Sequence, residues 1–374
     1  MNFLNIDWLD FELTGCKCAQ ILRKIVLFTN GWKSGSEPKS EWPQFQGRKG
    51  IEKMNVTRAV ITAAGRGARQ YPAADTVQKA MIPLVDRDGV TKPVLQIIAE
   101  EAMDSGVEDI CVVAAPGDEA IYRRQFQSYG EMLRKGFPDE AWAHDQATRM
   151  EELQDRLTFA VQAEPLGYGH AVWCAHERIG HEPFLLLLGD HLYISAEKRR
   201  CARQVIDAAK AKNGSISAVQ PTREHLIHQY GTVAGKRLSD SPHLYDIQEI
   251  VEKPDPTTAE LRLTVPGLRA GHYLCFFGIH ALSPTIFDIL AQMMRDDVRD
   301  QGQFALTTAL NKLISHEAYY ALETQGIRHN LGVKYGVVEA QIALALAGEG
   351  RERMLGMLVN TFAKLEQSQS AERT

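Results

Sequence analysis

Hydrophobic and polar positions divide the chain into an irregular N-terminal part and a long regular part. From Arg58 onward, short apolar runs alternate with longer segments in which apolar residues recur at helical spacing. This alternation predicts a largely parallel sheet with helices on both faces. The expected strands are AVITAA (59–64), DICVVAA (109–115), LTFAVQ (157–162), SISAVQP (215–221) and the stretch 270–282.

One further strand is predicted to be buried on both sides. FLLLLGD (184–190) is a continuous apolar run that ends in Gly-Asp, which is typical of a central strand whose carboxyl end borders a site. Helices are expected near 94–105 and within 339–367, where good helix formers dominate. We therefore predict an α/β fold, Rossmann-like with three α/β/α layers, around a mixed, mostly parallel central sheet.

The first 53 residues lack this regularity. Three of the five tryptophans lie here, within and around the polar run GSEPKSEWPQFQGRKG. We expect residues 1–53 to form a poorly ordered N-terminal extension. Met54 directly precedes the first convincing strand and is an alternative start of the folded unit.

Composition narrows the class of protein. The 374 residues are 44% hydrophobic, enough for a sizeable core, and the net charge is −5. Without a global basic excess, we expect neither nucleic acid nor a membrane as a partner. Six scattered cysteines without a CxxC pair are typical of a reducing compartment. No apolar stretch reaches the ~20 residues of a membrane span and no signal peptide is evident, so the chain is expected in the cytoplasm.

A glycine-rich loop follows the first strand in AAGRGARQYP (63–72). The bare amides of Gly65 and Gly67 and the guanidinium of Arg69 could converge on a triphosphate. A dinucleotide-binding fingerprint is the competing interpretation, but Gln70 stands where its third glycine is required. A purely structural turn is the other alternative.

Two charged residues could complete this phosphate site. Lys79 precedes Pro83 in a segment that can fold back over the loop, although a solvated surface lysine is the ordinary alternative. Asp190 ends the buried strand, where a carboxylate is costly unless it meets a cation. One or two carboxylates together with substrate phosphates commonly hold Mg²⁺, so Asp190 is the candidate metal ligand, with a structural cap as the alternative.

Two other segments have polar groups suited to a base and a sugar. Gln162 closes a strand and precedes Gly167 in QAEPLGYGHAV, and its amide carries both a donor and an acceptor for a pyrimidine edge. Glu252 and Lys253 lie in VEKP, where proline ends a strand. The carboxylate could accept hydrogen bonds from sugar hydroxyls, and the ammonium could neutralise a sugar phosphate. A solvent-exposed Glu-Lys pair at the edge of the sheet, without a functional role, is the alternative.

Together these segments resemble the bacterial UTP:glucose-1-phosphate uridylyltransferase family of sugar nucleotidyltransferases. The family patterns AAGxGTRxxP, KxMxP and EPLGLGHAV read here AAGRGARQYP, KAMIP and EPLGYGHAV, and VEKP is unchanged. The resemblance extends from about Ala59 to about Ala363. It implies a nucleotidyltransferase domain over 54–367, with a nucleotide half (54–195), a sugar-phosphate half (196–335) and C-terminal helices (336–367).

The resemblance also implies a reaction and a role for each candidate. A nucleoside triphosphate, expected to be UTP, and a sugar 1-phosphate, expected to be glucose 1-phosphate, would react by Mg²⁺-assisted direct displacement at the α-phosphorus. Arg69, Lys79, Asp190 and Lys253 would be catalytic, and Asp190 would bind the metal. The nucleotide would contact Ala63, Ala64, Gly65, Gly67, Gln162 and Gly167; the sugar would contact Gly231, Glu252 and Lys253. Members are commonly oligomeric, so a homo-oligomer is a further expectation.

Four departures from the family pattern leave alternatives open. Ala68 replaces a threonine, Asp75 a lysine, and Thr308 and Asn330 each an aspartate. Asn330 stands where related transferases have a second metal ligand, so weaker metal binding is expected. Asp75, Thr308 and Asn330 leave a non-catalytic nucleotide-sugar sensor as an alternative. A transferase specific for dTTP or another sugar phosphate is a second one, because uracil and thymine differ by a single methyl group. An NAD-dependent oxidoreductase is a weaker alternative.

Overall fold

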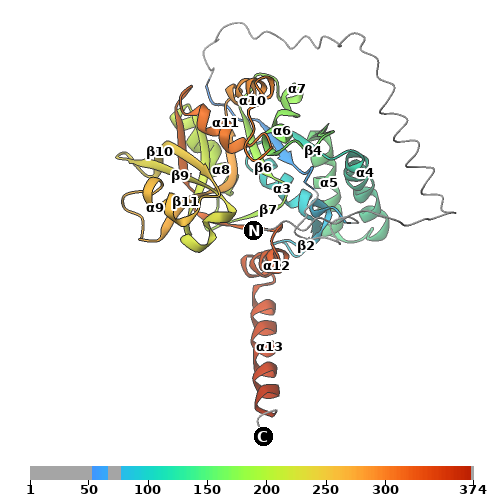
Figure 1. Cartoon of the computed structure of the whole chain (residues 1–374). Coiled ribbons are helices and arrows are strands. Elements are labelled where there is room, and N and C mark those ends of the chain that lie inside the picture. The colour runs from blue at the N-terminus through green and yellow to red at the C-terminus, as the bar shows by residue number, and fades with distance from the viewer. Residues whose placement is uncertain (1–52, 66–76, 372–374) are drawn as a thin grey trace, which may run out of the picture. The chain divides into compact units, whose positions relative to one another are not determined.

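A nine-stranded sheet runs through the computed structural model, which describes residues 53–65 and 77–371, with side chains as far as Leu365 (Figure 1). Its strand order is β5-β4-β1-β6-β11-β8-β12-β10-β9. The described residues belong to one compact unit that begins at Ile51. The predicted extension 1–53 lies outside the described residues except for Lys53.

The strands of this sheet are β1 (Arg58–Thr62), β4 (Asp109–Ala114), β5 (Leu157–Val161), β6 (Phe184–Leu188), β8 (Ser215–Arg223), β9 (Gly231–Leu238), β10 (Ser241–Glu252), β11 (His272–Leu282) and β12 (Tyr319–Glu323). Two small sheets accompany it: β2 (Pro83–Val85) with β3 (Thr91–Pro93), and β7 (His191–Ser195) with β13 (Gly326–Asn330).

The helices are α3 (Val94–Met103), α4 (Asp118–Gly136), α5 (Ala141–Arg156), α6 (Tyr168–Trp173), α7 (His176–Ile179), α8 (Cys201–Lys212), α9 (Pro256–Arg262), α10 (Thr285–Arg295), α11 (Leu306–Leu313), α12 (Gly336–Ala347) and α13 (Arg351–Ala371). Two 3₁₀ helices are η2 (Lys79–Met81) and η3 (Glu224–Gln229). None of the helices in this described part is long and apolar enough to cross a bilayer.

The predicted mixed sheet is confirmed, and its two halves differ in strand direction. β5, β4, β1 and β6 run parallel to one another, whereas β11 is antiparallel to both β6 and β8. β12 runs parallel to β8, but β10 is antiparallel to β12 and β9. The parallel share is therefore smaller than the sequence pattern indicates, because β9 and β10 form a hairpin without a crossover helix.

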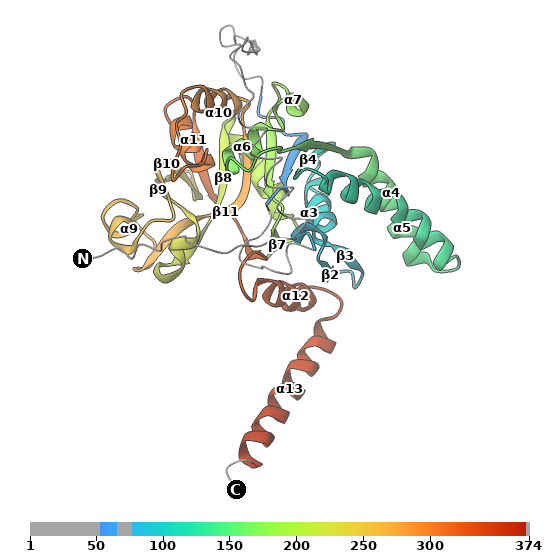
Figure 2. The same cartoon turned by 45° about the vertical axis from the view of Figure 1, so that its right-hand side comes forward.

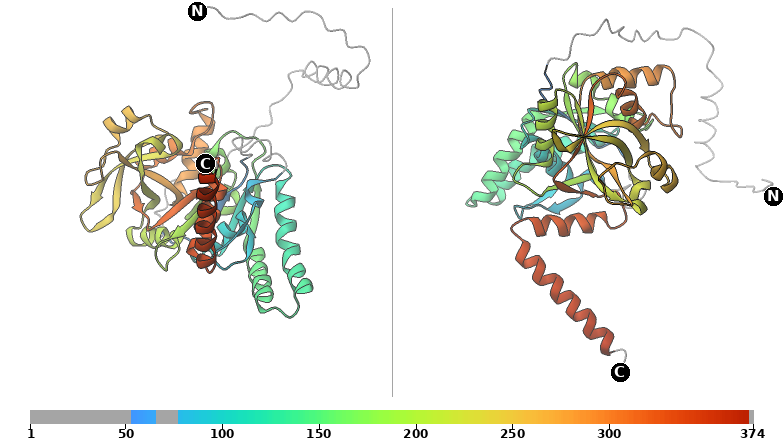
Figure 3. Two further views of the ribbon diagram at one scale, coloured as in Figure 1. Left: turned by 90° about the horizontal axis from the view of Figure 1, so that it is seen from below. Right: turned by 90° about the vertical axis from the view of Figure 1, so that its left-hand side faces the viewer.

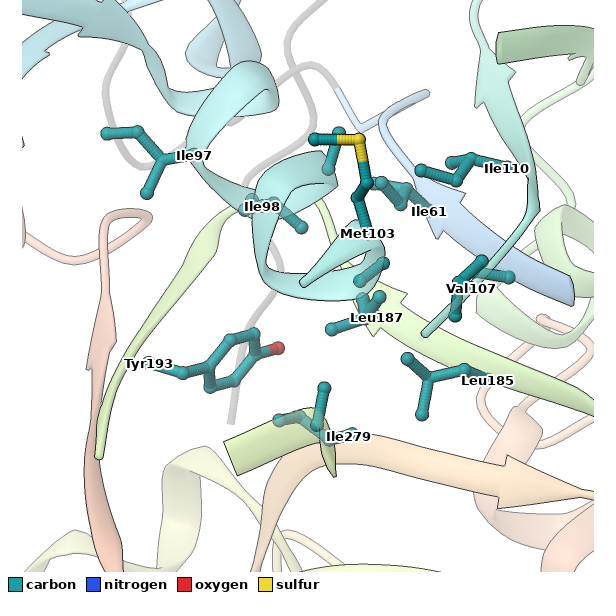
Figure 4. Packing of buried hydrophobic residues seen from close by; sticks show 14 of the residues in the cluster. Ile61, Ile97, Ile98, Met103, Val107, Ile110, Leu185, Leu187, Tyr193 and Ile279 are labelled. Atoms are coloured by element: carbon teal, nitrogen blue, oxygen red, sulfur yellow. The ribbon is translucent and has the colours of Figure 1, made fainter. Parts of the chain in front are cut away.

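Successive residues of the central strand face two different cores, which confirms the three layers. Leu185 and Leu187 pack with α3 and α8, whereas Phe184 and Leu186 pack with α6, α10 and α11. In Figure 2, α6, α10 and α11 lie side by side, apart from α3. All four side chains are fully buried, and each contributes about 1.5–3 kcal/mol on burial. Figure 4 shows the first core, where Ile98 and Met103 of α3 lie over strand residues that include Ile61, Leu187 and Ile279.

The C-terminal helices were predicted within 339–367 and begin and end slightly outside that range. α12 packs against the first core through Ala340 and Leu344. α13 follows it and extends away from the sheet (Figure 3).

A buried charge network fixes the β2–β3 hairpin to α3. The Lys92 side chain is only 2% exposed, and its Nζ lies 3.0 Å from Asp86, 2.6 Å from Asp88 and 2.9 Å from Glu100. Burial would lower the pKa of Lys92, but the surrounding carboxylates raise it above its ordinary value. The lysine therefore stays charged and neutralises two carboxylates that are themselves buried.

Lys92→Met is expected to lower the free energy of unfolding by about 3–5 kcal/mol, because it removes the cation nearest to the buried Asp86 and Glu100 and leaves them only the longer contacts to Arg87 and Arg149. Urea denaturation followed by circular dichroism measures the change. Lys135→Met is the matched control, since the Lys135 side chain is 79% exposed in its pair with Glu131. That control should change stability by no more than about 0.5 kcal/mol, and equal effects of the two substitutions would contradict this account.

Candidate functional site

The carboxyl ends of the parallel strands meet at one edge of the sheet. Ala63 follows β1, Gln162 follows β5, and Gly189 and Asp190 follow β6. Main-chain hydrogen bonds of 2.8–2.9 Å from Ala63, Gln162 and Gly189 to the neighbouring strands extend the parallel register past the strand ends. Three interstrand spacings, about 14 Å, separate the ends of β5 and β6, room for a ligand with a base at one end and phosphates at the other.

Asp190 is the centre of the charged end of this edge. Its Oδ2 lies 3.0 Å from Nζ of Lys79 in η2, and its Oδ1 lies 2.8 Å from Nδ1 of His191. Burial would raise the pKa of Asp190, but hydrogen bonds and charge interactions with His191 and Lys79 outweigh it and hold that pKa well below its usual range. The carboxylate is thus ionised and held between two nitrogen groups.

The turn after β13 brings a second oxygen to the same point. Asn330 pairs with His191 across the β7–β13 ladder, and the Leu331 amide donates to the Asp190 carbonyl at 2.9 Å. A methyl group at Gly332 would lie 3.0 Å from Oδ2 of Asp190 and 3.1 Å from Oδ1 of Asn330. It would also lie 3.3 Å from Nζ of Lys79. Gly332 therefore leaves space for three polar groups to converge.

This arrangement fits a hard divalent cation. The Asp190 carboxylate and the Asn330 amide oxygen are both ligands of the kind that Mg²⁺ prefers. The Lys79 ammonium is the positive charge beside them. Within residues 53–65 and 77–371, no three acidic, histidine or cysteine side chains gather as a self-sufficient metal site. A cation held here would need further oxygens from a ligand, as phosphates provide.

The opposite end of the edge carries an amide. Gln162 is 8% exposed, and its Nε2 lies 3.1 Å from the Gly167 carbonyl and 3.2 Å from Nδ1 of His170. The loop that contains Gly167 is held by main-chain hydrogen bonds to Phe304 on both sides. Gln162 is therefore positioned by its own loop.

A third group of residues comes from the antiparallel half. Glu252 lies opposite Gly231 in the β9–β10 hairpin; its Oε1 is 3.2 Å from Nζ of Lys253, and its Oε2 accepts from the Thr307 hydroxyl at 2.5 Å. A methyl group on Gly231 would lie 2.7 Å from the Phe276 ring, so only glycine permits this approach. Lys253 has a φ of +45°, a left-handed conformation that is unusual outside glycine and often marks a site.

Tyr168 links the two halves of the site. Burial raises the pKa of its phenol, and the carboxylates of both Asp190 and Glu252 act in the same direction, while Thr62 at the end of β1 lies beside the hydroxyl. The Tyr168 phenol is therefore affected by one carboxylate from each half of the sheet.

The family model for nucleotidyl transferases matches residues 58–327, which include the described residues of this site except Asn330 and Gly332. The chain belongs to the nucleotidyl transferase family.

Curated relatives and a solved structure resemble this chain over most of its length and nearly all of their own. UTP–glucose-1-phosphate uridylyltransferase of Bacillus subtilis strain 168 is 32% identical over 314 residues, covering 83% of this chain and 99% of that protein. The enzyme of the same name from Streptococcus pneumoniae serotype 4 is 33% identical over 296 residues, covering 78% and 91%. A solved UDP-glucose pyrophosphorylase complexed with UDP-glucose is 25% identical, with a TM-score of 0.63 over 77% of this chain and 98% of that chain.

Most of the residues predicted for this nucleotidyl transferase site lie around it. Lys79, Asp190 and Asn330 converge at one end, Gln162 and Gly167 at another, and Gly231, Glu252 and Lys253 form the third group; Ala63, Ala64 and Gly65 follow β1 between them. Gly67 and Arg69, with the departures at Ala68 and Asp75, lie outside the described residues. Their predicted roles stay predictions.

The sequence predicted no role for three residues of this site. His191 bonds Asp190, Gly332 provides the space beside it, and Thr307 bonds Glu252. A histidine directly after the strand-ending aspartate and a glycine two residues after Asn330 are weak local signals. Thr307 shows none, because its partner lies 55 residues away and meets it only through the α11–β10 packing.

Gly332→Ala is expected to weaken binding of a Mn²⁺–UTP complex by about ten- to hundredfold, the equivalent of the roughly 1–3 kcal/mol cost of a methyl group forced into filled space. Isothermal titration calorimetry measures the dissociation constant. Gly356→Ala in α13 is the control, since a methyl group there meets nothing within 4 Å. Unchanged affinity in Gly332→Ala would show that this convergence does not serve the ligand.

Proposed function

We propose that the chain transfers a uridylyl group from UTP to glucose 1-phosphate, giving UDP-glucose and pyrophosphate. The observation that carries this proposal is the convergence of Lys79, Asp190 and Asn330 beside the carboxyl end of β6. The relatives that match nearly from end to end are named UTP–glucose-1-phosphate uridylyltransferases, which supports the choice of both substrates.

The reaction is a direct displacement at phosphorus. A phosphate oxygen of the sugar 1-phosphate forms a bond to the α-phosphorus of UTP, while the bond from that phosphorus to the β-phosphate bridging oxygen breaks. Pyrophosphate departs with the electron pair of the broken bond. Such a step needs little covalent chemistry from the protein, so positioning and charge neutralisation supply most of the rate.

The charged end of the site would bind the triphosphate. Lys79, with Arg69 of the glycine-rich loop, would neutralise phosphate oxygens, and the amides of Ala64, Gly65 and Gly67 would donate to them, since the Ala63 amide already donates to Val113. Asp190 and the Asn330 oxygen would hold Mg²⁺, with His191 fixing the orientation of the carboxylate. When bound, Mg²⁺ supplies positive charge shared between the reacting phosphates.

The antiparallel half would bind the sugar phosphate. Glu252 accepts hydrogen bonds from hexose hydroxyls with its orientation fixed by Thr307, and Lys253 neutralises the phosphate of glucose 1-phosphate. Gly231 has no side chain, which would leave room for the sugar ring. Gln162 and Gly167 bind the base at the far end of the sheet edge.

The departures at Asn330 and Thr308 weaken this activity without removing it. Asn330 supplies an oxygen but no charge, so more Mg²⁺ is needed for half-maximal rate than an aspartate would require. Thr308 leaves Glu252 its hydrogen bond, because that bond comes from its neighbour Thr307. We place this activity in the cytoplasm, consistent with the reducing environment that the cysteines indicate: Cys111, Cys174, Cys201 and Cys275 are free thiols.

A homo-oligomer formed through α13 is part of the proposal. Leu355, Leu358, Phe362 and Leu365 repeat at the 3-4-3 spacing of a helix-pairing seam. Phe362 is 64% exposed and Leu365 is 53% exposed, and a single helix of this length gains little stability in water without packing. A second copy of this chain, packing its own α13 against this seam, would cover these apolar side chains.

Purified protein with Mg²⁺ and glucose 1-phosphate is expected to release pyrophosphate with UTP in preference to CTP, ATP and GTP. In Asp190→Ala the rate should fall by about 10²- to 10³-fold, the range found when one group that stabilises transition-state charge is removed. A coupled pyrophosphate assay measures both. Asn330→Asp is the companion variant and should need less Mg²⁺ for half-maximal rate. Binding of UDP-glucose without release from any triphosphate would favour the non-catalytic sensor.

Phe362→Glu is expected to convert the oligomer to a monomer, because it places two charges in the α13 seam. Light scattering after size-exclusion chromatography measures the mass. Leu261→Glu in α9 is the matched control, since Leu261 is 78% exposed and lies outside the seam. A wild-type chain that is monomeric at micromolar concentration would refute the pairing.

A further inference from the structure

The orientation of the Gln162 amide decides which base edge it can bind. An amide presents donors on its nitrogen side and an acceptor on its oxygen side, so the two possible orientations favour opposite partners. Uracil carries a hydrogen on N3, whereas cytosine carries a lone pair there. Whatever holds the amide in one orientation therefore also selects the base.

Two neighbours determine this orientation. The Gly167 carbonyl lies 3.1 Å from Nε2 of Gln162, and a carbonyl can only accept, so it requires the nitrogen side of the amide. The second hydrogen of Nε2 then points to Nδ1 of His170 at 3.2 Å. That hydrogen bond forms only if Nδ1 carries a lone pair.

The surroundings of His170 are consistent with this tautomer. Its Nε2 lies 3.8 Å from Sγ of Cys174, a soft acceptor for the hydrogen that Nε2 carries when Nδ1 is bare. Burial lowers the pKa of His170, which favours the neutral ring that the bond requires. The Glu164 carbonyl, 3.1 Å from Nδ1, competes for a hydrogen on that nitrogen. Glu164 is exposed, so water can satisfy its carbonyl instead.

We infer that His170 is a positioning residue for base selection: its Nδ1, together with the Gly167 carbonyl, holds both amide hydrogens of Gln162 and leaves only the Oε1 oxygen to face the base. This inference rests on the proposed function, because it assigns the base to this end of the site. An oxygen alone accepts from the N3 hydrogen of uracil or thymine and repels the N3 lone pair of cytosine. His170 itself touches no substrate.

The test compares binding of UTP and CTP, each with Mg²⁺, by isothermal titration calorimetry in the full chain. The wild type should bind UTP more tightly. In His170→Leu only the Gly167 carbonyl still restrains the amide, so the ratio of the UTP and CTP affinities should fall by about tenfold, the equivalent of one hydrogen bond. His170→Asn, whose side-chain oxygen can accept in place of Nδ1, should restore most of the ratio. His170→Ala examines the same point should the leucine variant fail to fold.

His176→Leu is the matched control. This second histidine bonds the Trp173 carbonyl and stacks on its indole, away from Gln162, so its loss should leave the ratio unchanged. A wild type that binds CTP as tightly as UTP, or a His170→Leu variant that keeps the wild-type ratio, would overturn the inference.

The two proposals fail in different ways. Absence of pyrophosphate release from every triphosphate, with the affinity ratio lost in His170→Leu and regained in His170→Asn, would refute the transferase and leave the role of His170 standing. Release that depends on Asp190, with a ratio that no change at His170 alters, would do the reverse.

Discussion

A carboxylate at the end of a strand that is buried on both faces must be neutralised, and this requirement organises the site. Asp190 follows the most apolar strand of the sheet, and Lys79, His191 and Asn330 all converge on it. These partners come from η2, β7 and β13, which are far from one another in the sequence. Meeting at Asp190, they tie the small β7–β13 sheet and the segment after the glycine-rich loop to the edge of the main sheet.

The parts of the fold that depend on local pattern were predictable. The apolar run 184–188 and the alternation from Arg58 onward gave the parallel strands and the three layers, because a strand buried on both faces has no polar positions. The β9–β10 hairpin and the β7–β13 pairing were missed. All four strands carry polar residues. The β9–β10 ladder is in addition interrupted by register shifts, and β7 and β13 are separated by more than a hundred residues.

The site was predictable where chemistry and spacing coincide in one segment. Asp190, Glu252 and Gln162 each stand at a strand end with a matching motif. Asp190 and Gln162 lie at the edge where the parallel strands end, whereas Glu252 ends β10 in the antiparallel half. Side-chain contacts could not be predicted. The bond between the adjacent residues His191 and Asp190 depends on side-chain directions, and the bond from Thr307 to Glu252 joins residues 55 positions apart; only the packed fold sets both.

The ion pair between Lys79 and Asp190 affects how the protein without nucleotide binds free metal ions. Because its ammonium is attached to the chain 3.0 Å from Asp190, it competes for that carboxylate at a high effective concentration that dilution does not lower. A free cation must displace this internal competitor, whereas a cation that arrives already chelated by a triphosphate brings its own anions for the ammonium to bind. The ion pair therefore acts as a filter that disfavours bare ions and admits the metal chiefly as a nucleotide complex.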